Sequence, residues 1–278
     1  MRRNHAAISD PGLVAERRTT SIPTGQMVWR IWGHGDPLVL IHGDFGSWTH
    51  WIRNIGPLSE RFRVFAPDMP GYGDSDLPPE PWSPDSLAGL LADGLNSLLP
   101  ADQTYHVAGF SFGGIIAAHL AAQEGGRIPK LVLLGPGGFG CRPGALPDLR
   151  RPAKDMTPQE LAEVHRHNLA ALMIGNPTKA DDLAVELQMN NARKARIRAG
   201  AIPATDILVR ALPRVRSRLY GIWGGRDAMT GDVRERERRL RQFQQDIDFR
   251  VIPDAGHWSP YEAADTVNAA LVEMLSQP

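Results

Sequence analysis

One short stretch, Gly109-Phe110-Ser111-Phe112-Gly113, constrains the local geometry of this 278-residue chain more tightly than any other. It stands between an apolar run at 106–108 and a segment of small and apolar residues at 112–123 that ends at two glycines. Glycines on both sides of a serine at such a junction are typical of a sharp strand-to-helix turn, because the flanking positions tolerate little side-chain bulk. We therefore predict a strand that ends at Gly109, a helix that begins at Phe112, and Ser111 on the turn between them.

Short apolar runs alternate with helical segments on both sides of this turn. The runs that predict strands lie at 27–32, 38–41, 63–66, 106–108, 131–134, 219–223 and 249–252, and the helical segments at 48–58, 85–99, 112–123, 233–243 and 260–275. This alternation indicates βαβ units, and hence an α/β fold with a mostly parallel central sheet flanked by helices.

The alternation stops between Pro136 and about Pro213. A loop rich in glycine and proline at 137–152 and helical segments at 158–174 and 179–199 take the place of strands there. We therefore predict a core formed by residues 1–136 and 213–278, with residues 137–212 inserted after the sixth core strand as a helical lid.

The charge balance limits the kinds of partner. Lys+Arg and Asp+Glu both number 31, so no long-range field attracts the chain to nucleic acid or to an anionic membrane. Cys141 is the only cysteine, which excludes an intramolecular disulfide and favours the cytoplasm. We expect a small-molecule substrate, no metal, no cofactor, no nucleic acid and no membrane partner, and leave a homodimer open.

Two other predicted strand ends carry polar residues that could assist Ser111. Asp227 follows the strand at 219–223, and His257 follows the strand at 249–252. Because the carboxyl ends of parallel strands meet at one edge of a sheet, these side chains can converge, and the order Ser, Asp, His is that of a hydrolytic triad on such a sheet. We predict Ser111 as nucleophile, His257 as base and Asp227 as the orienting acid. Asp232 and Asp254 are the rival orienting residues.

The glycine-containing turn His42-Gly43-Asp44-Phe45-Gly46 follows the strand at 38–41. Backbone N–H groups of such a turn and of the residue after the serine can bind an oxyanion. We expect Phe112 and Asp44 to supply them, with Phe45 as the next candidate. Because a carboxylate near a forming oxyanion would raise the barrier, the Asp44 side chain is expected to point away and to cap the helix at Trp48.

Together these motifs resemble the α/β-hydrolase fold family, in two blocks at about 28–136 and 216–275. Within it the chain is similar to small capped bacterial enzymes, namely carboxylesterases, haloperoxidase-like esterases and meta-cleavage-product hydrolases. The resemblance implies a serine hydrolase that acts through an acyl-enzyme on a small, largely apolar carboxylic ester, lactone or thioester. A carbon–carbon bond hydrolase of vinylogous diketones is the alternative, and a non-catalytic small-molecule receptor on the same fold is a further one.

The same resemblance suggests which residues contact the substrate. Phe110, Trp258 and Met173 are expected to form an apolar wall. Arg193 stands where the meta-cleavage-product hydrolases carry an arginine for a substrate carboxylate. Two departures from that group are Phe110, in place of its asparagine, and Asp44, in place of a small residue.

Overall fold

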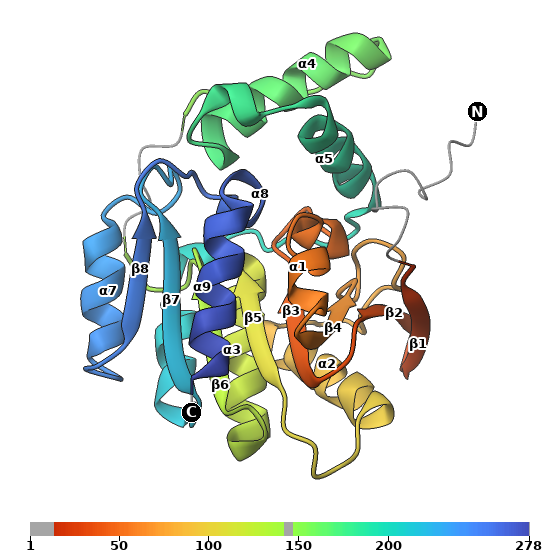
Figure 1. Ribbon diagram of the computed structural model, residues 1–278. Helices are drawn as coiled ribbons and strands as arrows, with labels where there is room; N and C mark the ends of the chain where they lie inside the picture. The colour runs from red at the N-terminus through yellow and green to blue at the C-terminus, as the bar shows by residue number, and fades with distance from the viewer. Residues whose placement is uncertain (1–13, 142–146, 278) are drawn as a thin grey trace.

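A computed structural model of the chain describes residues 14–141 and 147–277 and contains an eight-stranded sheet (Figure 1). Its strand order is β1-β2-β4-β3-β5-β6-β7-β8, and β2 pairs antiparallel with β1 and β4 while the other pairs are parallel. The strands are β1 Glu16–Ile22, β2 Gly25–Trp32, β3 Asp36–Ile41, β4 Phe62–Pro67, β5 His106–Phe110, β6 Lys130–Leu134, β7 Arg218–Gly224 and β8 Asp248–Ile252. The α/β fold with a mostly parallel sheet is confirmed.

Helices cover both faces of this sheet (Figure 1). The α-helices are α1 Ile55–Ser59, α2 Pro84–Leu98, α3 Phe112–Glu124, α4 Pro158–Asn168, α5 Asp182–Lys194, α6 Ile207–Ala211, α7 Val233–Arg241, α8 Ser259–Glu262 and α9 Ala264–Ser276. Single turns are η2 Trp48–Trp51, η3 Gly125–Arg127, η5 Pro177–Lys179, η6 Ile202–Ala204 and η7 Leu212–Arg214, and η4 Leu169–Met173 is a π-helix.

The hydrophobic core is split into two layers by the sheet. Along β3, Val39 and Ile41 pack with α2 and α3, whereas Leu38 and Leu40 pack with α1 and α9 on the opposite face. Successive side chains of a strand point to opposite faces, so a strand buried on both faces is a continuous apolar run. This explains why the buried parallel strands could be predicted from such runs.

Several local features differ from the prediction. Strand β1 was not expected, because its residues are mostly exposed and polar. The helix expected at 48–58 is divided into η2 and α1, and the one expected at 179–199 ends at Lys194. In the last case Arg196 N–H donates to the carbonyl of Gly71 at 2.8 Å, so the backbone bonds the core instead of continuing the helix.

The segment between β6 and β7 is called the insertion below. Its helices α4 and α5 stand beyond the carboxyl ends of the strands (Figure 1), whereas α6 packs against α3 in the core. The last residues of the predicted lid therefore contribute to the core. In the described part of the chain, no helix has both the length and the apolar character needed to cross a membrane.

Candidate active site

The Gly-x-Ser-x-Gly stretch forms the sharp turn that the sequence predicts. Ser111 lies between β5 and α3 with φ at +54°, in the left-handed region that residues with a Cβ rarely adopt. A Cβ at Gly109 would lie 2.5 Å from the carbonyl oxygen of Gly113, and one at Gly113 would lie 2.3 Å from that of His42. Both glycines are therefore required, because the start of α3 packs directly onto β5 and the end of β3.

Strand pairing places this turn beside the turn that follows β3. Ile41, the last residue of β3, pairs with Gly109, the last but one of β5, so the two chain segments leave the sheet at the same edge. A Cβ at Gly43 would lie 3.0 Å from the Cβ of Ser111. The chain order reverses between β3 and β5, and such a switch point is where open α/β sheets bind their ligands.

Ser111, His257 and Asp227 lie in a hydrogen-bonded row. The Ser111 Oγ is 2.9 Å from His257 Nε2, and His257 Nδ1 is 2.8 Å from Asp227 Oδ2. Ser111 is partly exposed, whereas the other two side chains are buried. A Cβ at Gly224 would lie 2.1 Å from the carbonyl oxygen of Gly256, so this glycine lets the two loops approach. The row can transfer a proton from the serine to the imidazole.

Asp227 has further donors besides the histidine. Its Oδ1 accepts the backbone N–H groups of Met229 at 2.8 Å and Thr230 at 3.1 Å, and its Oδ2 accepts the Thr230 hydroxyl at 2.8 Å. Burial alone would raise the pKa of Asp227, but the charge of His257 and these hydrogen bonds outweigh it and lower the pKa. The acid is therefore held as a carboxylate. The two rival orienting residues lie away from His257, because Asp232 caps α7 and Asp254 pairs with Arg226.

Two buried histidines that were not predicted to have a role hold the turn after β3. The Nδ1 atom of His42 lies 2.7 Å from the carbonyl oxygen of Gly43, and its Nε2 atom accepts a hydrogen bond from the N–H of Met69 at 3.0 Å. His50 Nδ1 accepts the N–H of Gly43 at 3.2 Å. Burial lowers the pKa of both histidines, which keeps both rings neutral. Only the His42-Gly43 motif was a signal for this arrangement in the sequence.

The contacts of His42 and His50 with Gly43 fix the orientation of one backbone donor. The Gly43 carbonyl and the Asp44 N–H belong to one planar trans peptide, so they point in opposite directions. In the described part of the chain, no acceptor pairs with the backbone N–H of Asp44 or Phe112. Phe45 N–H instead donates to Asp44 Oδ1 at 2.9 Å. The geometry thus favours Asp44 and Phe112 over Phe45 as oxyanion donors.

The Asp44 carboxylate makes contacts other than the expected helix cap. It accepts the Tyr72 hydroxyl at 2.7 Å and the N–H of Ala199, in the insertion, at 3.1 Å. The predicted cap at Trp48 is wrong, because Ser47 caps this turn and Trp48 N–H donates to Asp68 at 3.0 Å. The carboxylate is thus held by neighbouring donors at the base of the insertion.

The four predicted substrate-binding residues have different environments. Trp258 is 0% exposed, stacks on Tyr261 and donates to the carbonyl of His50, so it packs the core and presents no surface to a substrate. Phe110 is also buried, with its ring 5.1 Å from that of His257.

The other two predicted residues lie in the insertion. Met173 is partly buried, and its carbonyl accepts from Trp258 N–H at 2.7 Å. Arg193 is exposed and donates to Asn190 on its own helix at 3.0 Å, so the structure does not bring it to Ser111.

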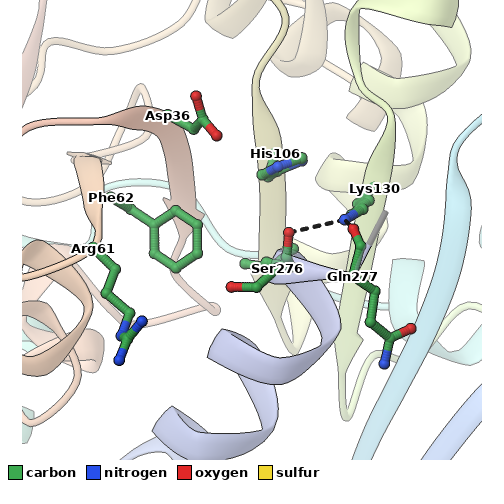
Figure 2. Close-up of a pocket in the computed structure, with 8 residues that line it drawn as sticks. Asp36, Arg61, Phe62, His106, Lys130, Ser276 and Gln277 are labelled. Carbon is green, nitrogen blue, oxygen red and sulfur yellow. Dashed lines mark hydrogen bonds between the residues drawn. The ribbon is translucent and has the colours of Figure 1, made fainter.

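A polar hollow of about 540 Å³ lies at the opposite end of the sheet (Figure 2). Its lining includes the first residues of four strands, Asp36, Phe62, His106 and Lys130. Ligands of open α/β sheets bind at the carboxyl ends of strands, so the row at Ser111 is the better candidate. Within residues 14–141 and 147–277, no group of three or more His, Cys, Asp or Glu is placed to hold a metal ion.

Known proteins with similar sequence or structure include both hydrolases of carbon–carbon bonds and esterases. A 2-hydroxy-6-oxo-6-phenylhexa-2,4-dienoate hydrolase of Burkholderia cepacia is 26% identical over 259 residues, which is 88% of this chain and 89% of that protein. The crystal structure of a meta-cleavage product hydrolase has a TM-score of 0.74 at 22% identity, covering 94% of this chain and 98% of that one. The crystal structure of naproxen esterase from Bacillus subtilis has a TM-score of 0.77 at 20% identity, covering 98% of this chain and 94% of that one.

The family itself follows from a match over most of the chain. The model of the alpha/beta hydrolase family matches residues 38–270, which includes both turns and both loops described above. The sheet order and the position of the serine turn agree with this match. The chain belongs to the alpha/beta hydrolase family.

Proposed function

We propose that the chain is a serine hydrolase that cleaves small, largely apolar carboxylic esters, lactones or thioesters through an acyl-enzyme on Ser111. The observation that carries the proposal is the row from Ser111 Oγ to His257 Nε2 at 2.9 Å and from His257 Nδ1 to Asp227 at 2.8 Å. A hydroxyl paired with an imidazole, which is itself held by a buried carboxylate, is an activated nucleophile.

In the proposed mechanism each group has one role. Ser111 Oγ attacks the substrate carbonyl carbon while His257 Nε2 accepts the serine proton. The N–H groups of Asp44 and Phe112 stabilise the negative charge on the carbonyl oxygen. His257 then gives the proton to the leaving group, and water activated by His257 releases the acid. Asp227 orients the imidazole and stabilises its charged form.

Hydrolysis of a carbon–carbon bond is the second candidate, because relatives that span most of the chain carry that activity in their names. Those names describe carboxylate-bearing substrates. The arginine expected to bind such a carboxylate, Arg193, is exposed and bonded to Asn190. We therefore place ester hydrolysis first.

The test is steady-state hydrolysis of p-nitrophenyl esters, from acetate to decanoate, by the wild type and by Ser111→Ala. We expect turnover that is highest at one chain length and falls by several orders of magnitude in the variant. The same two proteins are assayed with 2-hydroxy-6-oxo-6-phenylhexa-2,4-dienoate. Serine-dependent turnover of the dienoate alone would select the second candidate, and binding without turnover of either class would select a receptor.

A further inference from the structure

Glu262 places a buried carboxylate between the insertion and the loop that carries His257. The side chain lies at the end of α8, and the residue is 4% exposed. Its Oε2 accepts the N–H groups of Gly256 at 2.7 Å and Gly175 at 2.8 Å, and its Oε1 accepts the N–H of Asn176 at 2.7 Å. Hydrogen bonds from N–H groups to a carboxylate are stronger than those between neutral groups, so one side chain ties three backbone positions together.

The insertion also holds the other side of His257. Trp258 N–H donates to the carbonyl of Met173 at 2.7 Å, and Met173 is the last residue of the π-helix η4. A Cβ at Gly256 would lie 2.4 Å from the backbone nitrogen of Gly175, so the two backbones are in direct contact. Both chain neighbours of His257 are therefore bound, directly or through Glu262, to residues 173–176 of the insertion.

We propose that Glu262 is a positioning residue that keeps His257 in line with Ser111 by fastening the histidine loop to residues 173–176. This proposal rests on the proposed function, because it assigns His257 the role of the base. Glu262 makes no hydrogen bond with Ser111, Asp227 or His257, and its effect passes through Gly256. Since the Ser111–His257 distance is 2.9 Å, a shift of the loop by about 1 Å breaks the proton-transfer contact and can lower the rate about a hundredfold.

The bonding pattern predicts a graded response to substitution. In Glu262→Gln the amide oxygen can stay at the Oε2 position, where two N–H groups converge, and only the Asn176 N–H faces an NH₂ group. The contact to Gly256 is then kept, and we expect kcat within about tenfold of the wild type. Glu262→Ala loses all three contacts and Glu262→Asp withdraws the carboxylate by one methylene, so we expect kcat to fall about a hundredfold with little change in KM.

The control variant is Asp181→Asn. Asp181 also joins the insertion to the core, through its contacts with the Tyr261 hydroxyl of α8 and with Arg53 at 2.6 Å, but makes no hydrogen bond with residues 256–258 in the described part of the chain. If Glu262 acted only by general stabilisation of the insertion, substitutions of Glu262 and of Asp181 would have similar consequences for the triad.

Two readouts test the position of His257 without knowledge of the natural substrate. The first is the rate at which a fluorophosphonate labels Ser111, where the oxygen–phosphorus bond forms, fluoride leaves and His257 takes the serine proton. The second is the low-field proton resonance of His257 Nδ1–H bonded to Asp227, assigned by its loss in His257→Ala. Circular dichroism and thermal melts establish that each variant is folded.

We expect slow labelling and a shifted or broadened resonance in Glu262→Ala and Glu262→Asp, near wild-type behaviour in Asp181→Asn, and an intermediate result in Glu262→Gln. Wild-type labelling rates in a folded Glu262→Asp or Glu262→Ala would overturn the proposal. A wild type that is not labelled would instead refute the proposed function. In that case only the His257 resonance would test the positioning role of Glu262. An unchanged resonance in Glu262→Asp would exclude that role.

Discussion

Asp227→Asn tests whether the orienting acid sets the proton position on His257. In the structure Asp227 Oδ1 accepts two backbone N–H groups, from Met229 and Thr230, and these donors are fixed by the turn. The oxygen of an asparagine must therefore take the Oδ1 position. Its NH₂ group then takes the Oδ2 position, 2.8 Å from His257 Nδ1.

This orientation determines the size of the effect. An NH₂ group only donates, so His257 Nδ1 becomes the acceptor and the imidazole proton moves to Nε2. Protonated Nε2 cannot accept the proton of Ser111. The same change in a Ser-His-Asp triad lowers kcat by about 10⁴, which corresponds to about 5 kcal/mol of activation free energy. The shape of the side chain is unchanged, so we expect the variant to remain folded.

The assay is kcat/KM on the best p-nitrophenyl ester, with Asp254→Asn as the matched control. Asp254 was the rival orienting residue, and its side chain is 83% exposed and paired with Arg226. We expect the control to retain wild-type activity. Activity of Asp227→Asn within about tenfold of the wild type would refute the tautomer argument, and an equal loss in Asp254→Asn would refute the assignment of the acid.

Three further outcomes follow from the structure. Gly43→Ala places a Cβ 3.0 Å from that of Ser111, so we expect ester kcat to fall about tenfold or more, and an unchanged kcat would show that the turn can shift freely. Asp44→Asn leaves one backbone N–H donor without its acceptor, so urea denaturation should show that the free energy of unfolding falls by about 1–3 kcal/mol, with turnover nearly retained. A large gain in rate would mean that the charge of Asp44 faces the oxyanion. Burial, and next the charge of Lys130, lower the pKa of His106 to about 4, so the unfolded chain binds the extra proton first as the pH falls below 6.5. The wild type should therefore lose stability from pH 6.5 towards 4 more steeply than His106→Gln, and parallel melting curves would contradict this.

The sequence predicted those parts of the site that depend on local signals. Ser111 stands in a motif whose glycines are required by close backbone contacts, so the residues themselves specify the turn. Asp227 and His257 each follow an apolar strand, and the topology of a parallel sheet brings such loops to one edge. Position in the chain was therefore sufficient to predict that the three side chains meet.

Features that depend on contacts between distant segments were not predictable. Trp258 was expected to face the substrate, but it lies against His50 and Tyr261, and no pattern around Trp258 encodes that packing. Strand β1 lies at the edge of the sheet and is largely exposed, so it lacks the apolar run that marked the other strands. The end of α5 is set by a bond from Arg196 to the core, which a helical pattern in the sequence cannot show.

The insertion is bonded to two of the segments that the proposed mechanism uses, and this limits how its sequence can vary. Asp44, on the turn that supplies an oxyanion donor, holds Ala199, while Glu262 holds residues 175 and 176 and the histidine loop. The contacts to residues 176 and 199 join a side chain of the core to a backbone N–H of the insertion, so they do not depend on which side chain the insertion carries there, provided that it is not proline. Residue 175 has to stay glycine, because a Cβ there would lie 2.8 Å from the backbone nitrogen of Gly256. Side chains on α4 and α5 can therefore change to fit another substrate while these backbone contacts continue to hold the catalytic loops.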